Sequence, residues 1–322
     1  MSYFIYIPVL RGCGQTRKKS GMGREEVFFI EENYACMRII VAGAAGNLGY
    51  EVTSVLLEQG HEVVAIDRTI DRLESLRRGL AGLYSLDLRQ PKVPGEILRN
   101  AELVVTTIGI GRPQKLADFR DVDYQSNLNL LNVAKKAGIQ KFVYISVAGV
   151  DTDLSVPLLK AKHDFEGELT GSGLQYLIIR PSSYFTDVWR TFMSSAQKGS
   201  VTLIKTEEDY RFSPVHPRDV AEFIASNLEP GDRIVNVGGP EDFTYPEISN
   251  LCFEMIHTLP KLKMMSVSSF KTLLFLMKPL NPALWSVFRF LLWASTTDLT
   301  CPSIGNRNIR DYLRQKLDNQ AP

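Results

Sequence analysis

The sequence has 322 residues, of which 44% are hydrophobic and 23% charged, with a formal net charge of +1. This balance is typical of a globular protein with one large or two modest domains. The near-zero charge and the absence of an RNA-recognition motif argue against a nucleic-acid binder. The four cysteines and four histidines lack metal-ligand spacing, which argues against a disulfide framework and a metal site.

The first 36 residues differ from the rest of the chain. An apolar patch at 3–10 is too short for a secretory signal, and the basic residues follow it instead of preceding it. No hydrophobic periodicity is sustained, and a β-rich run begins directly after Met37. We expect residues 1–36 to be a disordered or misassigned extension, with a targeting or docking arm as the alternative.

Short apolar runs alternate with amphipathic stretches from Met37 to Arg180. The predicted strands are 38–42, 62–66, 83–86, 102–107, 141–146 and 175–179. The predicted helices are 48–59, 72–80, 122–138 and 158–169. Apolar strands separated by helices of about ten residues or more predict a parallel sheet covered on both faces. The fold class is therefore α/β, a Rossmann-type doubly wound parallel sheet that binds ligands at the carboxyl ends of its strands.

The loop after the first predicted strand carries the strongest local signal. It has the sequence G-A-A-G-N-L-G and opens a helix. The first glycine permits a tight turn, the second lets the backbone approach a pyrophosphate at the helix N-terminus, and the third allows close packing of helix on strand. The residues that we expect to bind NAD or NADP here are Gly43, Ala45, Gly46, Asn47, Leu48 and Gly49.

The end of the second predicted strand bears on the choice of cofactor. Asp67 stands there, and its carboxylate would accept hydrogen bonds from the adenosine ribose and repel a 2′-phosphate, which favours NAD. Arg68 follows, and its guanidinium suits a 2′-phosphate, which favours NADP. We expect NAD or NADP, with NAD slightly favoured. As the alternative, Asp67 only caps the segment after it.

Two further strand ends are expected to line the cofactor site. Asp87 and Leu88 close the third predicted strand, where Asp87 is suited to accept a hydrogen bond from the adenine amino group. Thr107 and Gly109 belong to a run of small residues after the fourth strand, which leaves room for pyrophosphate and ribose. The alternative for these residues is an ordinary turn.

Beyond Arg180 the predicted segments become shorter and less regular. Helices are predicted at 217–228 and 245–256, with a strand at 233–237 between them. Residues 255–297 contain no acidic residue, and their apolar stretches fall well short of the roughly 18 apolar residues that a membrane span needs. We expect two short amphipathic helices there. They either cap a substrate pocket or form a face for a membrane surface or a protein partner.

Six motifs occur in the order found in one enzyme superfamily. They are G-x-x-G-x-x-G from Gly43, D-Y-Q-S-N-L-N-L-L from Asp123, K-F-V-Y-I-S from Lys141, L-L-K-A-K-H-D-F-E from Leu158, S-G-L-Q-Y-L-I-I-R-P from Ser172 and S-P-V-H-P-R-D-V-A from Ser213. Together they resemble the extended and atypical short-chain dehydrogenase/reductases, above all the NmrA-like and divinyl-chlorophyllide-reductase-like branch. The resemblance covers about residues 37–239. It implies a nicotinamide cofactor, in either a reductase or a cofactor-binding regulator or assembly factor.

The usual proton donor of this superfamily is missing. Active members use Y-x-x-x-K, and Lys162 stands where the lysine is expected, but Leu158 occupies the position of the tyrosine. The resemblance implies that Lys162 holds the nicotinamide ribose and assists proton transfer. Tyr184 and Ser146 are the other candidate catalytic residues, and Pro181 is a further candidate for cofactor binding. The alternatives are an exposed helix lysine, an aromatic pocket wall and turn residues.

We therefore predict an NAD(P)-dependent oxidoreductase that reduces a carbonyl or conjugated double bond of an apolar substrate. The alternatives are a non-catalytic NAD(P)-binding sensor or assembly protein and a sugar-nucleotide epimerase or dehydratase. Residues 37–180 form the predicted cofactor core, and residues 181–322 an interleaved, partly helical substrate region. We expect a cytoplasmic location, with a membrane-peripheral one as the alternative.

Overall fold

The computed structural model describes residues 36–90, 93–111 and 113–320. Residues 1–35 lie outside these ranges, and so does the expectation that residues 1–36 form a disordered or misassigned extension, except at Cys36. Within them, seven strands form one central sheet in the order β11-β6-β5-β4-β1-β2-β3, and all neighbouring strands run parallel. The strands are β1 (Arg38–Ala42), β2 (Glu62–Asp67), β3 (Gly82–Ser85), β4 (Leu103–Thr106), β5 (Lys141–Ile145), β6 (Gln175–Pro181) and β11 (Arg233–Val237).

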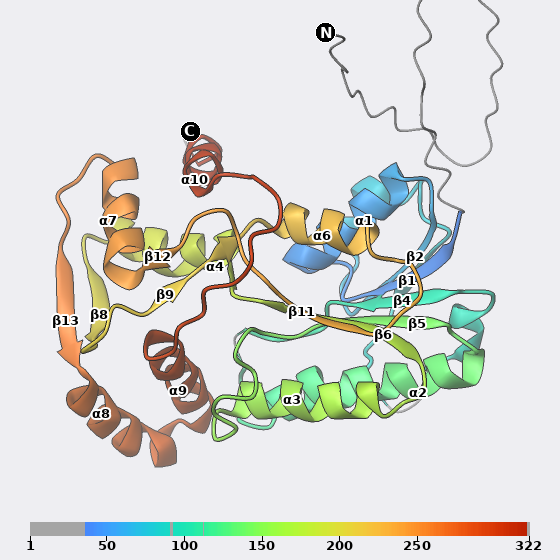
Figure 1. The fold of residues 1–322 in the computed structure, drawn as a ribbon, viewed down its shortest axis with the longest axis horizontal. Helices are drawn as coiled ribbons and strands as arrows, with labels where there is room; N and C mark the ends of the chain where they lie inside the picture. Colours follow the sequence, from blue (N-terminus) through green and yellow to red (C-terminus); the bar gives the residue numbers. More distant parts are fainter. Residues whose placement is uncertain (1–35, 91–92, 112, 321–322) are drawn as a thin grey trace, which may run out of the picture.

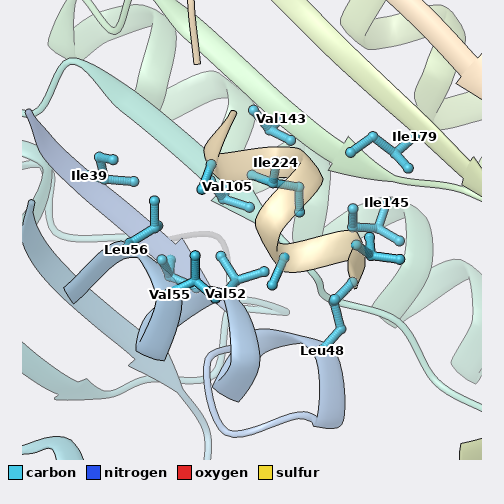
Figure 2. Packing of buried hydrophobic residues seen from close by; sticks show 14 of the residues in the cluster. Ile39, Leu48, Val52, Val55, Leu56, Val105, Val143, Ile145, Ile179 and Ile224 are labelled. Atoms are coloured by element: carbon cyan, nitrogen blue, oxygen red, sulfur yellow. The ribbon is translucent and has the colours of Figure 1, made fainter. Parts of the chain in front are cut away.

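Two layers of helices cover the two faces of this sheet (Figure 1). They are α1 (Asn47–Glu58) and α6 (Pro217–Ala225) on one face, and α2 (Asn127–Ala137) and α3 (Pro157–Thr170) on the other. Figure 2 shows Val52 and Leu56 of α1 packed in one cluster with Ile224 of α6. Along β5, Val143 belongs to this cluster and Tyr144 to the cluster on the α2–α3 face. The inner strands β1, β4 and β5 are buried on both sides, and the predicted doubly wound parallel sheet is confirmed.

The connection from β2 to β3 differs from the sequence prediction. The α-helix predicted at 72–80 is wrong, because the segment forms only a short 3₁₀ helix, Asp71–Leu76. Leu73 is the buried residue of this helix, so the segment lacks the continuous apolar face that holds a longer helix against a sheet. The helix predicted at 122–138 is present in two parts, a π-helical turn at Arg120–Ser126 followed by α2.

The second half of the chain returns to the sheet. β11 extends the sheet beside β6, and α6 packs against α1. Arg218 of α6 forms an ion pair with Glu58 of α1. Arg307 forms ion pairs with Asp219 and Glu222 of α6. Residues after β6 therefore build part of the central sheet layer as well as the region outside it.

The region outside the sheet has its own apolar core, with Phe185, Phe253 and Trp293 among its buried members. Its elements are β7 (Ser183–Tyr184), α4 (Phe185–Val188), α5 (Ser194–Gln197), β8 (Val201–Lys205), β9 (Arg211–Phe212), β10 (Pro214–Val215), β12 (Phe243–Thr244), α7 (Tyr245–Met255), β13 (Leu262–Ser266), α8 (Val267–Leu280), α9 (Pro282–Ser295) and α10 (Ile309–Asp318). The two short helices predicted within 255–297 are confirmed as α8 and α9. None of the helices in the described part of the chain is both long enough and apolar enough to cross a membrane.

Candidate functional site

The glycine loop between β1 and α1 is tightly confined. Gly43 has a φ of +76°, and a Cβ placed on it would lie 2.8 Å from Thr107 Oγ1. A Cβ on Gly49 would lie 2.0 Å from the Gly43 carbonyl oxygen. Larger residues at these two positions would push the loop away from the end of β4 or from the start of α1. The glycines therefore set the path of the backbone, as the sequence pattern predicts.

The start of α1 suits an anionic ligand. The N-cap residue is Gly46, so no N-cap side chain accepts a hydrogen bond from the first backbone N–H groups of α1. The first turn also contains no acidic residue. The first backbone N–H groups of a helix have no partner within the helix, and the helix dipole favours negative charge beside them. A bare N-terminus with a crowded glycine loop fits the pyrophosphate of a dinucleotide.

Asp67 ties the end of β2 to this loop. Its Oδ2 accepts a hydrogen bond from the Ala45 amide at 3.0 Å, and its Oδ1 accepts one from the Arg68 amide at 2.7 Å. A carboxylate offers about four lone-pair positions, so Asp67 keeps acceptor capacity for a ribose hydroxyl. The residue thus has a structural role in addition to the binding role predicted for it.

A cleft of about 270 Å³ opens at the carboxyl ends of the strands around the glycine loop. The predicted cofactor residues that line it are Gly43, Ala45, Gly46, Asp67, Arg68, Asp87, Leu88, Thr107 and Gly109. The predicted residues outside its lining are Asn47, Leu48, Gly49, Lys162 and Pro181. Leu48 is buried in the α1–α6 core, and Pro181 ends β6. The lined part corresponds to the adenosine and pyrophosphate half of the predicted site.

Arginine side chains crowd the adenosine end of the cleft. Arg89 lines the cleft and binds the carboxylate of Asp87 through Nε, at 2.9 Å and 3.0 Å from the two oxygens. This hydrogen bonding lowers the pKa of Asp87. It also competes with the predicted bond from Asp87 to the adenine amino group.

Arg72 is a residue that the sequence patterns do not single out. Its Nη1 lies 3.1 Å from Asn47 Oδ1 and 3.3 Å from the Ala45 carbonyl oxygen, against the glycine loop. The 3₁₀ helix after β2 brings it there, and no local motif predicts that approach. Arg72 thus holds the glycine loop from outside the lining of the cleft. The slight preference for NAD stays a prediction.

Lys162 is part of a buried ion pair. Its Nζ lies 3.1 Å from Asp123 Oδ1, and it donates a hydrogen bond to the Ile145 carbonyl at 3.2 Å. The Asp123 side chain is fully buried and that of Lys162 is 11% exposed. Burial raises the pKa of Asp123, and the Lys162 ammonium opposes this shift. Lys162 is therefore not the exposed helix lysine of the alternative interpretation.

This ion pair lies directly behind the wall of the cleft. Asp123 Oδ2 accepts a hydrogen bond from the Ile110 amide at 3.2 Å. A Cβ on Gly109, which lines the cleft, would lie 2.9 Å from Asp123 Oδ1 and 3.4 Å from Lys162 Nζ. Because Gly109 has no side chain, the loop after β4 leaves room for Lys162 Nζ to approach the cleft. Asp123 opens the D-Y-Q-S-N-L-N-L-L motif, and its acidic character within that run is the sequence signal for a charged partner.

The two other catalytic candidates lie in different surroundings. Ser146 follows Ile145, whose carbonyl accepts the bond from Lys162, and its buried hydroxyl has no hydrogen-bond partner among the described residues. Tyr184 packs against the α1–α6 core, and its buried hydroxyl likewise lacks a partner there. Burial raises the pKa of Tyr184 far above its ordinary value. Ser146 is thus the next residue in the chain after the carbonyl that Lys162 contacts, whereas no hydrogen bond joins Lys162 to Tyr184 among the described residues.

A family model described as NAD(P)H-binding matches residues 43–230. Among curated proteins, the photosystem II assembly factor Ycf39 of Trieres chinensis is 25% identical over 260 residues, which cover 80% of this chain and 77% of that protein. The photosystem II assembly factor Ycf39 of Synechocystis sp. is 26% identical, over 68% of each chain. The divinyl chlorophyllide a 8-vinyl-reductase of Cucumis sativus is 25% identical, over 72% of this chain and 60% of that protein.

Solved structures show the same fold. The NADPH-dependent quinone oxidoreductase of Escherichia coli, complexed with NADPH, superposes with a TM-score of 0.67 at 17% identity, over 87% of this chain and 99% of that one. The UDP-glucose 4-epimerase of Thermus thermophilus, complexed with NAD, gives a TM-score of 0.60 at 23% identity, over 79% of this chain and 99% of that one. At these identities the likeness establishes the architecture alone.

Proposed function

The chain belongs to the NAD(P)H-binding family, in the atypical short-chain dehydrogenase/reductase branch, and on that premise we propose that it is an NAD(P)H-dependent reductase. The predicted cofactor class, NAD or NADP, is confirmed by the family match. The proposed substrate is an apolar molecule with a carbonyl or a conjugated double bond. The observation that carries the proposal is the buried Lys162 ammonium behind the wall of the cleft.

When bound, NAD(P)H supplies the hydride. The protein's residues bind and orient it. Gly43 and Gly46 let the backbone approach the pyrophosphate, and the free N–H groups at the start of α1 stabilise its charge. Asp67 and Arg68 act at the adenosine ribose. Gly43 and Gly46 lie in the loop after β1, and Asp67 ends β2, so the buried strands β1 and β2 set the positions of these residues.

Lys162 acts at the nicotinamide end of the proposed site, where it supplies a positive charge and hydrogen-bond donors. An ammonium group has three N–H donors. The Ile145 carbonyl accepts one of them and Asp123 pairs with the charge, so donor capacity remains for a ribose hydroxyl or a substrate oxygen. Asp123 acts as a positioning residue, since it holds the ammonium in one place without facing the cleft itself. The buried hydroxyl of Ser146, which has no hydrogen-bond partner among the described residues, is our candidate for relaying a proton.

One observation supports an apolar substrate. The curated relative from Cucumis sativus is by name a vinyl-reductase of divinyl chlorophyllide a. We propose that residues 181–322 bind the substrate.

A second candidate function is a cofactor-binding assembly protein without turnover. Leu158 occupies the position of the superfamily's tyrosine, which removes the usual proton donor. The relatives from Trieres chinensis and Synechocystis sp. are by name assembly factors. In that case the Lys162–Asp123 pair would only hold α3 against the loop after β4.

Lys162→Met tests the choice between these functions. Oxidation of NADPH and NADH is followed with the full chain and a panel of quinones, enones and vinyl-substituted porphyrins. For a reductase we expect Lys162→Met to lower kcat/KM about a hundredfold or more, because positioned proton donors contribute on that scale. Lys160→Met is the matched control, since Lys160 lies on the same helix with its side chain 56% exposed.

Folding is controlled separately. Removing one partner of a buried pair leaves an uncompensated charge, whereas replacing both with apolar residues is often tolerated. The double variant Asp123→Leu/Lys162→Met should therefore melt close to wild type and remain inactive. Unchanged kcat/KM in Lys162→Met contradicts the proposed role. A wild-type chain that binds cofactor but oxidises none across the panel favours the assembly function.

A further inference from the structure

α8 and α9 form a helical hairpin at one end of the molecule, next to β13 (Figure 1). Asn281 joins them, and its Oδ1 accepts a hydrogen bond from the Leu284 amide at 3.0 Å. Phe270 of α8 stacks on Phe288 of α9, with ring centroids 5.7 Å apart. Leu274 is buried in the same small core. The inner faces of the two helices thus bury their apolar side chains against each other.

The outer side of the hairpin leaves large apolar side chains in solvent. Phe275 is 79% exposed, Leu276 57% and Leu280 84%. Leu284, at the start of α9, is 41% exposed. These four residues, called the hairpin tip, flank the turn at Asn281 from both helices. Apolar side chains gathered in solvent at one place mark an interaction surface.

The charged residues of the hairpin segment itself are all positive. Residues 255–297 contain no Asp or Glu. Lys271 and Lys278 lie exposed on α8, and neither forms an ion pair with a described residue. Arg289, on α9, is ion-paired to Asp153 and is thereby neutralised. The tip therefore presents apolar groups and unneutralised ammonium groups side by side.

We propose that the hairpin tip inserts into the headgroup region of an anionic lipid membrane. Apolar side chains of a short helix bury at the acyl boundary, while lysines beside them attract the lipid phosphates. Trp285 suits the same place, because its ring is amphipathic and Lys278 Nζ lies 5.0 Å from the ring centroid. The lysine stem can lie along apolar surface with its ammonium at the phosphates.

Charge argues against a second copy of the chain as the occupant. Two tips face to face would bring Lys271 and Lys278 of both copies together, with no acidic residue on either hairpin to offset them. An anionic bilayer offers many phosphates and requires no matching shape. The inference goes beyond the proposed function, because membrane contact does not depend on hydride transfer.

Flotation of the full chain with lipid vesicles tests the inference. The vesicles contain phosphatidylcholine alone, or phosphatidylcholine with roughly 30% phosphatidylglycerol. We expect binding to the anionic vesicles, at least about tenfold weaker binding to the neutral ones, and loss of binding at high salt. Phe275→Ser/Leu280→Ser should reduce anionic binding about tenfold or more, and each Lys→Gln change at Lys271 and Lys278 about fivefold.

Matched variants elsewhere on the surface serve as controls. Leu116→Ser/Ile234→Ser removes apolar side chains that are 39% and 45% exposed. Lys135→Gln/Lys136→Gln removes two exposed lysines at the end of α2. Both should bind as wild type does. Equal binding to neutral and anionic vesicles, or binding that the tip variants leave unchanged, overturns the proposal. A chain that ignores vesicles but forms a dimer through Phe275 and Leu280 also overturns it.

Discussion

The cofactor cleft and the α8–α9 hairpin treat apolar side chains in opposite ways. Beside the cleft, Val52 and Leu56 of α1 are fully buried between the sheet and α6 (Figure 2). At the hairpin, Phe275 and Leu280 stand in solvent. The buried pair contributes to folding stability by removing apolar surface from water, whereas the exposed pair adds nothing to the core. The proposed cofactor site and the proposed interaction surface therefore lie in separate parts of the chain.

The largest expected effect lies in the glycine loop. Gly43 and Gly138 have nearly the same φ, +76° and +75°, but a Cβ on Gly43 would lie 3.0 Å from the Ile108 amide nitrogen. A Cβ on Gly138 would meet no described atom within 4 Å. Gly43→Ala should lower the free energy of unfolding by about 3 kcal/mol and abolish cofactor binding. Gly138→Ala should lower it by only about 1 kcal/mol, with binding retained.

Urea unfolding and calorimetric titration with NADPH measure both effects. Equal losses of stability in the two alanine variants would mean that the loop relaxes around the added methyl group. In that event the tight packing around Gly43 would not be what fixes the loop.

His216 gives the next effect, on the pH dependence of stability. It caps α6 by accepting a hydrogen bond from the Arg218 amide at 3.0 Å on Nδ1. Burial, and then the charge of Arg307, lower its pKa from 6.5 to about 4. Between these values the unfolded chain binds a proton that the folded chain does not. The contribution of neutral His216 to the free energy of unfolding is thus fully present above pH 6.5 and is lost as the pH falls towards 4.

His216→Asn separates this titration from the cap, because asparagine caps helices and does not titrate. We expect the wild-type melting temperature to fall by a few degrees from pH 7 to about 5, and the fall to be smaller in the variant. Thermal melts over that range supply the measurement. Parallel curves for the two proteins would show that other groups cause the loss.

The smallest expected effect is at the hairpin tip. Phe275→Ser/Leu280→Ser should change the free energy of unfolding by less than about 0.5 kcal/mol, because exposed side chains away from special features contribute little. The same double variant is the one expected to lose membrane binding. If urea unfolding showed a loss of several kcal/mol, comparable to a core substitution, the tip would be packed in solution and the contrast with α1 would disappear.

Much of the cofactor half could be predicted because its signals are local. The G-A-A-G-N-L-G run sets turn, helix start and close packing within a few residues. Asp67 and Thr107 follow directly from strand ends, and both line the cleft. The short pairs β7–β10 and β9–β12 were not predicted, since two-residue strands carry no periodicity.

The ion pair at the catalytic end could not be predicted in the same way. Lys162 and Asp123 come from different helices, and their contact depends on how the π-helical turn before α2 sets the Asp123 carboxylate against α3. Arg72 reaches the glycine loop only because the connection after β2 is a 3₁₀ helix. Neither contact leaves a pattern in sequence spacing.

By itself the sequence determined the strands of the cofactor core and most of its helices, the doubly wound sheet, the cofactor class and the acid-free character of residues 255–297. Tertiary structure decided that α6 and β11 return to the sheet, that Asp123 holds Lys162, and that Phe275 faces solvent. The physical reason is the range of the interactions. Turn geometry and periodicity act between near neighbours in the chain, whereas burial of a particular face depends on which distant segment covers it.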